Sequence, residues 1–193
     1  MGQYYKTVIK SDDGLGKLQK WSVIHPHEYG NGFKLMEHSW VGNKFVNAVV
    51  TALIDRGLCR VAHMGDYSDD SCIKVSNMRT KMEFYNKAWG KNYERYQVYI
   101  NEPVGRKDDV YIINESRQEY VRFMWQKPEG KEDCWWINTF MLLIAVGNGL
   151  GGGDYHGTNE GLVGRWAFDQ IRVSTIEPEG YLKIHGWEFK EDY

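Results

Sequence analysis

The segment Gly147–Gly157 has the composition best suited to binding a ligand, because six of its eleven residues are glycine. Glycine has no Cβ, so backbone amides can turn toward one guest, and successive amides of this kind bind anions. We therefore expect a loop that faces a phosphate or carboxylate group. The spacing Gly147-x-Gly149-x-x-Gly152 matches the dinucleotide fingerprint literally, but the residues after it do not open the helix that this motif requires. The alternative is a tight connection whose glycines only allow close packing against aromatic residues.

The triplet Gly-Asp-Tyr occurs twice, ending once at Tyr67 and once at Tyr155. Each copy ends an apolar run, where the scaffold fixes a side chain that is exposed at the mouth of a loop. Asp66 and Asp154 are candidates to bind ribose hydroxyls or a hard cation, and the two tyrosines are candidates to stack on a base. The alternative is a pair of Asx turns, in which each aspartate bonds the backbone two residues further on.

A cation stands beside a large ring at Arg165 and Trp166, in a chain with 13 Tyr, 8 Trp and 7 Phe. Tryptophan and tyrosine form stacking platforms for bases, and they also fill cores and protein interfaces. Most of these rings must therefore be core residues, while a minority lines a nucleotide pocket. The tryptophans that gather with Trp166 in the second half are Trp125, Trp135, Trp136 and Trp187.

The histidines suggest metal or acid–base chemistry only weakly. His25 and His27 would share one face of an extended segment, but a metal needs a third ligand from Glu37, His38 or His63. Glu37 and His38 also precede the strongest helix of the chain, but general acid–base work by this pair would need a cleft and a shifted pKa, and the sequence shows neither. We expect no metal and no cofactor, and the pattern assigns no catalytic residue.

Charge and cysteine content exclude several functional classes. With 24 Lys+Arg, 26 Asp+Glu and a net charge of −2, the chain lacks the cationic excess of a general nucleic-acid binder. No apolar run approaches the length of a transmembrane helix, and the N-terminus lacks the apolar core of a signal peptide. Cys59, Cys72 and Cys134 have no CxxC spacing, which favours reduced thiols in a cytoplasmic protein. The sequence does not decide whether the protein forms a homo-oligomer.

The elements that would position these residues follow from hydrophobic periodicity and capping signals. A helix should begin after Asn43 and end at Gly57, and a second should cover Asn77–Trp89. The run Trp135–Val146 is apolar throughout, so its pattern does not decide between helix and strand. We expect strands at Tyr4–Ile9, Trp21–Ile24, Leu58–Met64, Val98–Ile100, Asp109–Asn114, Glu119–Trp125 and, last, Phe168–Thr175. This order predicts an α+β fold, a single domain over residues 1–193 with a mostly antiparallel sheet and two or three helices.

Five segments together resemble a family of uncharacterised proteins that is widespread in bacteria and their phages. Its members begin with an MGQYY-type peptide and carry a GNGxGGGDY glycine-rich motif. The resemblance covers most of the chain, and it implies a soluble intracellular protein in a setting where phage genes often act on host defence. The matching segments are Met1–Lys6, Lys34–Trp40, Arg60–Tyr67, Gly147–Tyr155 and Leu162–Ala167.

These observations predict a binding protein for a small nucleotide-type ligand. If the protein is encoded by a phage, a setting that the resemblance implies, the ligand would be a host defence signal that the protein sequesters in the host cytoplasm. Loop amides and Arg165 would meet phosphate, and an aspartate would meet the ribose. The first alternative is a phosphodiesterase or glycohydrolase that uses the same loops, with acid–base or metal roles for Glu37, His38, Asp66, Asp154 or His156. The second is a protein that inhibits a host enzyme by binding it. The predicted ligand-binding residues are Asp66, Tyr67, Gly149, Gly151, Gly152, Asp154, Tyr155, His156, Arg165 and Trp166.

Overall fold

The computed structural model describes residues 2–12, 20–68, 78–90, 104, 109–124, 137–157 and 160–185. Across these residues the chain forms the predicted α+β fold, in which one mostly antiparallel sheet carries three α-helices. The strands are β1 (Tyr5–Ser11), β2 (Trp21–Ile24), β3 (Cys59–Gly65), β4 (Val110–Asn114), β5 (Glu119–Phe123), β6 (Ala145–Val146), β7 (Gln170–Ser174) and β8 (Leu182–Lys183). The helices are α1 (Lys44–Arg56), α2 (Met78–Trp89) and α3 (Phe140–Leu143), with short 3₁₀ turns η1 (Pro26–Tyr29), η2 (Leu35–His38) and η4 (Glu160–Leu162).

The sheet has the strand order β2-β1-β3-β7-β4-β5-β8, and β6 pairs with β3 off this path. β1 lies antiparallel to β3 over its whole length, from Tyr5 opposite Gly65 to Ser11 opposite Cys59. On its other side β3 meets β7 at its beginning and β6 at its end. The parallel pairs are β3 with β6 and β5 with β8. The end of β3 therefore lies between the first strand and the segment that leads into the glycine-rich loop.

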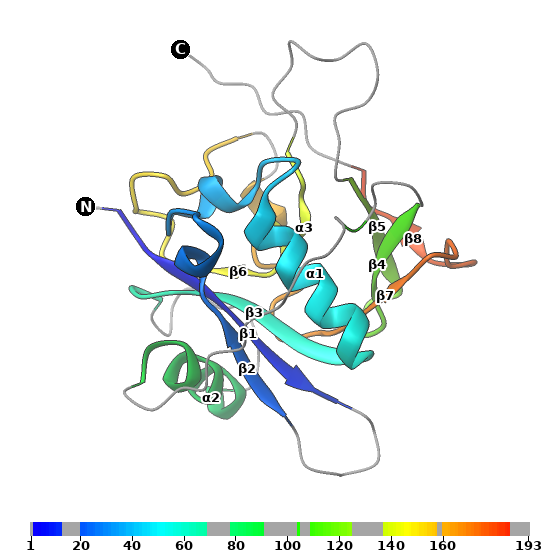
Figure 1. The fold of residues 1–193 in the computed structure, drawn as a ribbon, viewed down its shortest axis with the longest axis horizontal. Helices are drawn as coiled ribbons and strands as arrows, with labels where there is room; N and C mark the ends of the chain where they lie inside the picture. The colour runs from blue at the N-terminus through cyan, green and yellow to red at the C-terminus, as the bar shows by residue number, and fades with distance from the viewer. Residues whose placement is uncertain are drawn as a thin grey trace.

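Alternating residues of β1 pack into two different cores. Tyr5 and Ile9 belong to the larger core, which contains α1, while Val8 belongs to a second core with Phe84 and Ala88 of α2. Figure 1 shows α1 and α2 on opposite sides of β1 and β3. Side chains alternate between the two faces of a strand, and both faces of β1 are covered by an apolar layer. Side chains on both faces are therefore buried. β1 is therefore a central strand.

The helix α1 forms where its sequence signals place it. Asn43 accepts a hydrogen bond from the Val46 amide at 3.1 Å, and Gly57 follows the last turn with φ +71°. Asn43 is thus the N-cap predicted from the sequence, and Gly57 is the predicted glycine after the last turn. Most apolar positions of the helix, among them Phe45 and Leu53, are buried, whereas Ile54 is exposed.

Most predicted elements are confirmed within one or two residues of their ends, and two expectations need correction. The apolar run before residue 147 contains both a helical turn, α3, and a short strand, β6, so its uniform hydrophobicity concealed two elements. The strand β7 is not the last, because β8 follows it beside β5. The expected strand Val98–Ile100, Cys72, Cys134 and the tryptophans at positions 125, 135, 136 and 187 lie outside the described residues.

Within the described part of the chain, no helix combines the length and the apolar character needed to cross a bilayer.

Replacing Asn43 with alanine should lower the free energy of unfolding by about 1 kcal/mol, because the Val46 amide loses its acceptor. Urea denaturation followed by circular dichroism measures this change. The neighbouring Lys44→Ala is the control, since Lys44 is exposed and alanine favours a helix. Equal stability of the two variants would contradict the capping role.

Candidate functional site

A cavity of about 210 Å³ opens between the glycine-rich loop and the beginning of β1. Its wall combines apolar side chains with two phenols, an imidazole and two carboxyl groups. The residues that line it are Tyr5, Leu35, Gly147, Gly149, Asp154, Tyr155, His156, Glu160 and Val163. Four of these, Gly149, Asp154, Tyr155 and His156, are predicted ligand-binding residues, and the loop of Gly151 and Gly152 adjoins them.

Asp154 is the buried acid of this cavity, with 6% of its surface exposed. Its Oδ1 lies 2.9 Å from the Tyr5 hydroxyl, and its Oδ2 accepts a hydrogen bond from the Gly151 amide at 2.8 Å. These two bonds fix the orientation of the carboxyl group from opposite sides. A buried charge is tolerated only where such partners replace water.

Gln3 connects the first strand to the loop. Its Oε1 accepts from the Asn148 amide at 3.2 Å and lies 2.9 Å from the Tyr5 hydroxyl. The glycines at 147 and 151 make room for this arrangement. A Cβ at Gly147 would lie 2.0 Å from the Tyr5 oxygen, and one at Gly151 would lie 2.7 Å from the Gln3 backbone nitrogen. Glycine is therefore required at both positions by close packing.

Some of the loop amides that were expected to face an anion donate within the protein instead. The amide of Leu150 donates to the Asn148 side chain at 3.0 Å, and that of Asp154 donates to the Gly151 carbonyl at 2.9 Å. Together with the Asn148 and Gly151 amides, four donors of the segment are satisfied by the protein itself. Close packing against Tyr5 and Gln3 therefore accounts for the glycines at 147 and 151, and anion binding by the other amides of the segment stays a prediction.

The mouth of the cavity carries His156 and Glu160, both largely exposed, with His156 Nδ1 3.6 Å from Glu160 Oε1. Tyr155 is buried in the wall beside them. Acid, base and aromatic groups thus surround the space next to Asp154.

The other Gly-Asp-Tyr triplet lies next to the N-terminal segment and outside the cavity lining. The Tyr4 amide donates to Asp66 Oδ1 at 3.0 Å, and the Asp66 amide donates to the Tyr4 carbonyl at 2.9 Å. Tyr67 is half exposed. In the described residues neither Asp66 nor Asp154 forms the Asx turn considered above, because both carboxylates accept from residues that precede them. A ligand-binding role for Asp66 and Tyr67 stays a prediction.

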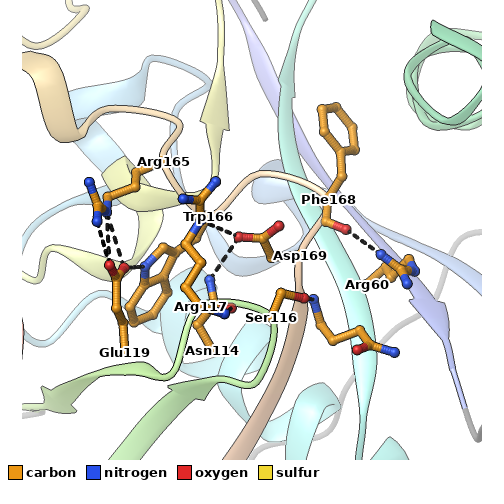
Figure 2. A network of polar contacts seen from close by, with 10 residues as sticks. Arg60, Asn114, Ser116, Arg117, Glu119, Arg165, Trp166, Phe168 and Asp169 are labelled. Carbon is orange, nitrogen blue, oxygen red and sulfur yellow. Dashed lines mark hydrogen bonds and ion pairs between the residues drawn. The ribbon is translucent and has the colours of Figure 1, made fainter. Parts of the chain in front are cut away.

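Arg165 and Trp166 point to a different place, the buried carboxylate of Glu119 on β5. Arg165 Nε lies 3.1 and 3.2 Å from the two carboxylate oxygens, and Trp166 Nε1 donates at 2.7 Å (Figure 2). Burial alone would raise the pKa of Glu119, but these hydrogen bonds outweigh it and hold the pKa below its usual value. Trp166 is completely buried. The pair therefore joins β5 to the segment before β7. Neither residue lines the cavity, and a ligand-binding role for Arg165 and Trp166 stays a prediction.

A second carboxylate holds the neighbouring turn in Figure 2. Asp169 Oδ2 accepts from Asn114 at 2.9 Å and from Arg117 at 2.7 Å, so the turn between β4 and β5 is tied to the beginning of β7. The Arg60 side chain donates to the Phe168 carbonyl at 3.1 Å. Phe168 adopts φ +69°, a strained backbone conformation for a non-glycine residue. These contacts hold the strained residue in place.

A chain of buried hydrogen bonds, which the sequence did not predict, lies behind Tyr5. Thr7 Oγ1 is 2.9 Å from His63 Nδ1, and His63 Nε2 is 2.7 Å from His38 Nδ1. His38 Nε2 lies 2.8 Å from the Gly32 carbonyl, and the His63 ring stacks on the Tyr5 ring at 5.1 Å. All three polar side chains are fully buried. The signal in the sequence was the placement of Thr7 and His63 at inward positions of apolar strands.

The Gly32 carbonyl, at one end of this series of hydrogen bonds, fixes the tautomers of His38 and His63. Gly32 can only accept, so neutral His38 carries its hydrogen on Nε2 and accepts at Nδ1. His63 must then donate from Nε2 and accept from the Thr7 hydroxyl. Burial lowers the pKa of His38 to about 4, partly opposed by its bond to Gly32, and burial with the nearby His38 lowers that of His63 well below its usual value. Both rings are therefore neutral at pH 7.

The remaining candidates for metal binding and nucleophilic chemistry are not supported. His27 lies in η1, so the expected extended segment is wrong, and His25 and His27 instead contact the Phe33 ring edge-on and face-on. The described residues contain no group of three or more His, Cys, Asp or Glu side chains arranged for a metal. Burial raises the pKa of the Cys59 thiol to about 11, in keeping with a small apolar strand residue. Glu37 accepts from the Lys34 amide and thereby caps η2.

Comparisons with family models, with curated proteins and with solved structures each find no match to this chain. The resemblance noted from the sequence therefore stays a prediction.

The buried histidines predict acid sensitivity. In the unfolded chain histidine takes up a proton near pH 6.5, whereas folded His38 resists protonation until about pH 4. The unfolded state binds more protons across this window, so the free energy of unfolding should fall as the pH falls from 6.5 to 4, by roughly 3 kcal/mol for His38 alone. His63 adds to the loss. Urea denaturation at a series of pH values measures it.

The double variant His38→Gln/His63→Gln should show a shallower pH dependence than the parent, and His185→Gln, at an exposed position, should leave the slope unchanged. A parent slope that persists in the double variant would show that the buried pair is not its source.

Gly147→Ala should destabilise the chain by about 1–3 kcal/mol, because the added Cβ overlaps the Tyr5 oxygen in a tightly packed region. Gly152→Ala is the matched control, since its Cβ would meet no atom within 4 Å. Thermal unfolding of both variants compares them directly. Equal melting temperatures would mean that the loop does not pack against Tyr5.

Proposed function

We propose that the chain is a binding protein for a small nucleotide-type ligand, which it holds in the cavity between the glycine-rich loop and β1. The observation that carries this proposal is the Asp154 carboxyl group, buried in the cavity wall and oriented by Tyr5 and Gly151. A fixed, desolvated acceptor in a concave, partly apolar site is what specific recognition of a polar ligand requires.

The size and lining of the cavity support binding of one part of such a ligand. At about 210 Å³ it lies below the roughly 300–1,000 Å³ of pockets that enclose drug-sized molecules. Its wall combines apolar Leu35 and Val163 with the polar groups of Tyr5 and Asp154. Such a mixture fits a sugar or base, with the rest of the molecule reaching into solvent.

The resemblance to bacterial and phage proteins supports the more specific form of this proposal, in which the bound molecule is a host defence signal that the protein sequesters in the cytoplasm. Reduced cysteines fit that compartment. Under this proposal the protein withholds its ligand and leaves it chemically unchanged.

A second candidate function is hydrolysis of the bound nucleotide, which the pair His156 and Glu160 at the cavity mouth favours. An imidazole beside a carboxylate can serve as a general base for water. Chromatography of ligand recovered after incubation separates the two: unchanged ligand supports sequestration, and product that disappears in His156→Ala supports hydrolysis.

Asp154→Asn should weaken ligand binding by about tenfold or more, because a neutral amide replaces the charged acceptor. Isothermal titration with NAD, ADP-ribose and cyclic di- and trinucleotides first finds a ligand and then compares variants. The matched control is Asp55→Asn, which makes the same change at an exposed position of α1, outside the cavity lining. Absence of binding for all these compounds at high concentration would overturn the proposed function.

A further inference from the structure

The Asp154 carboxyl group retains room for two more donors. An ionised carboxylate offers about four acceptor positions, and the bonds from Tyr5 and Gly151 use one on each oxygen. One position on Oδ1 and one on Oδ2 remain. Two acceptors side by side match two neighbouring hydroxyl groups, in the way that an acidic residue binds ribose hydroxyls in dinucleotide sites.

The Tyr5 hydroxyl can adjust to such a guest without losing a partner. It lies 2.9 Å from both Asp154 Oδ1 and Gln3 Oε1, and its single hydrogen can serve only one of them at a time. When a ligand hydroxyl donates to Oδ1, the Tyr5 hydrogen can turn to Gln3. Ligand binding at Asp154 therefore leaves no buried hydroxyl unsatisfied, which would otherwise weaken it.

The same surroundings are unsuited to phosphate. Three of the loop amides, those of Asn148, Leu150 and Gly151, already donate within the protein, and Arg165 is held by Glu119 outside the cavity lining. A phosphate inside the cavity would instead face the carboxyl groups of Asp154 and Glu160, and like charges at close range repel.

We infer that the ligand enters sugar end first, with a vicinal diol across the two oxygens of Asp154 and with its phosphate groups outside the cavity. This inference rests on the proposed function and specifies which end of the ligand the protein recognises. It reverses the orientation expected from the sequence, in which the glycine-rich loop would have held the phosphate.

Titration of the parent protein with the common ribonucleosides, their 2′-deoxy counterparts and their 5′-monophosphates tests the orientation. Ribonucleosides should bind more tightly than the deoxy compounds, by about tenfold or more, because the deoxy compound lacks one hydrogen bond to a charged acceptor. The 5′-phosphate should not strengthen binding. Equal binding of ribo and deoxy forms, or binding strengthened tenfold by phosphate, would overturn the inference and leave the proposed function standing.

Two variants locate the diol. The preference for ribose should vanish in Asp154→Asn and persist in Glu160→Gln, and the reverse result would place the diol on Glu160 and overturn the inference. Free D-ribose is a further arm: if it binds as tightly as the nucleosides, the diol contact is supported while the nucleotide-type ligand of the proposed function is not. Failure of every nucleoside, nucleotide and sugar to bind would overturn both.

Discussion

The structure depends on the antiparallel pairing of β1 with β3, which buries β1 between two helical layers. Because side chains alternate along a strand, this pairing directs Tyr5, Thr7 and Ile9 toward the α1 side and Val8 toward α2. Tyr5 then meets the glycine-rich loop, and Thr7 begins the buried histidine chain. A shift of register by one residue would turn both toward α2 and separate Asp154 from its hydroxyl partner. The cavity and the histidine chain are thus two results of one register.

The sequence predicted what local interactions decide. Asn43 and Gly57 bound α1 because capping uses neighbouring residues, and the hairpin of β4 and β5 has its turn signal within the same segment. Contacts between distant residues were inaccessible to such patterns. Nothing near Arg165 indicates that Glu119 neutralises it, and nothing near Gly151 indicates that its amide serves Asp154. Four residues of the predicted site line one cavity, whereas four of the loop amides expected to face an anion are used by the fold itself.

Two guanidinium groups, those of Arg117 and Arg165, are held away from the cavity by carboxylate partners. On the β7-β4-β5-β8 side of the sheet, carboxylates and guanidinium groups neutralise one another, as Glu119 does with Arg165 and Asp169 does with Arg117. The carboxyl groups beside the glycine-rich loop have no arginine among the residues that line the cavity. The paired charges therefore tie the strands and turns of that half of the sheet to one another, whereas the Asp154 carboxyl group is held by a hydroxyl and an amide.

The bond between Tyr5 and Asp154 joins residues 149 positions apart, which has a consequence for biosynthesis. At roughly 5–20 residues per second, the ribosome needs on the order of ten seconds to reach Asp154 after it has made Tyr5. During this interval β1 can pair with β3, whose partner residues are only about one third as distant, but the cavity has no wall. Such long-range closure is slow compared with local structure formation. The wall of the cavity can therefore be completed only after both partners of the β1–β3 pair have been synthesised.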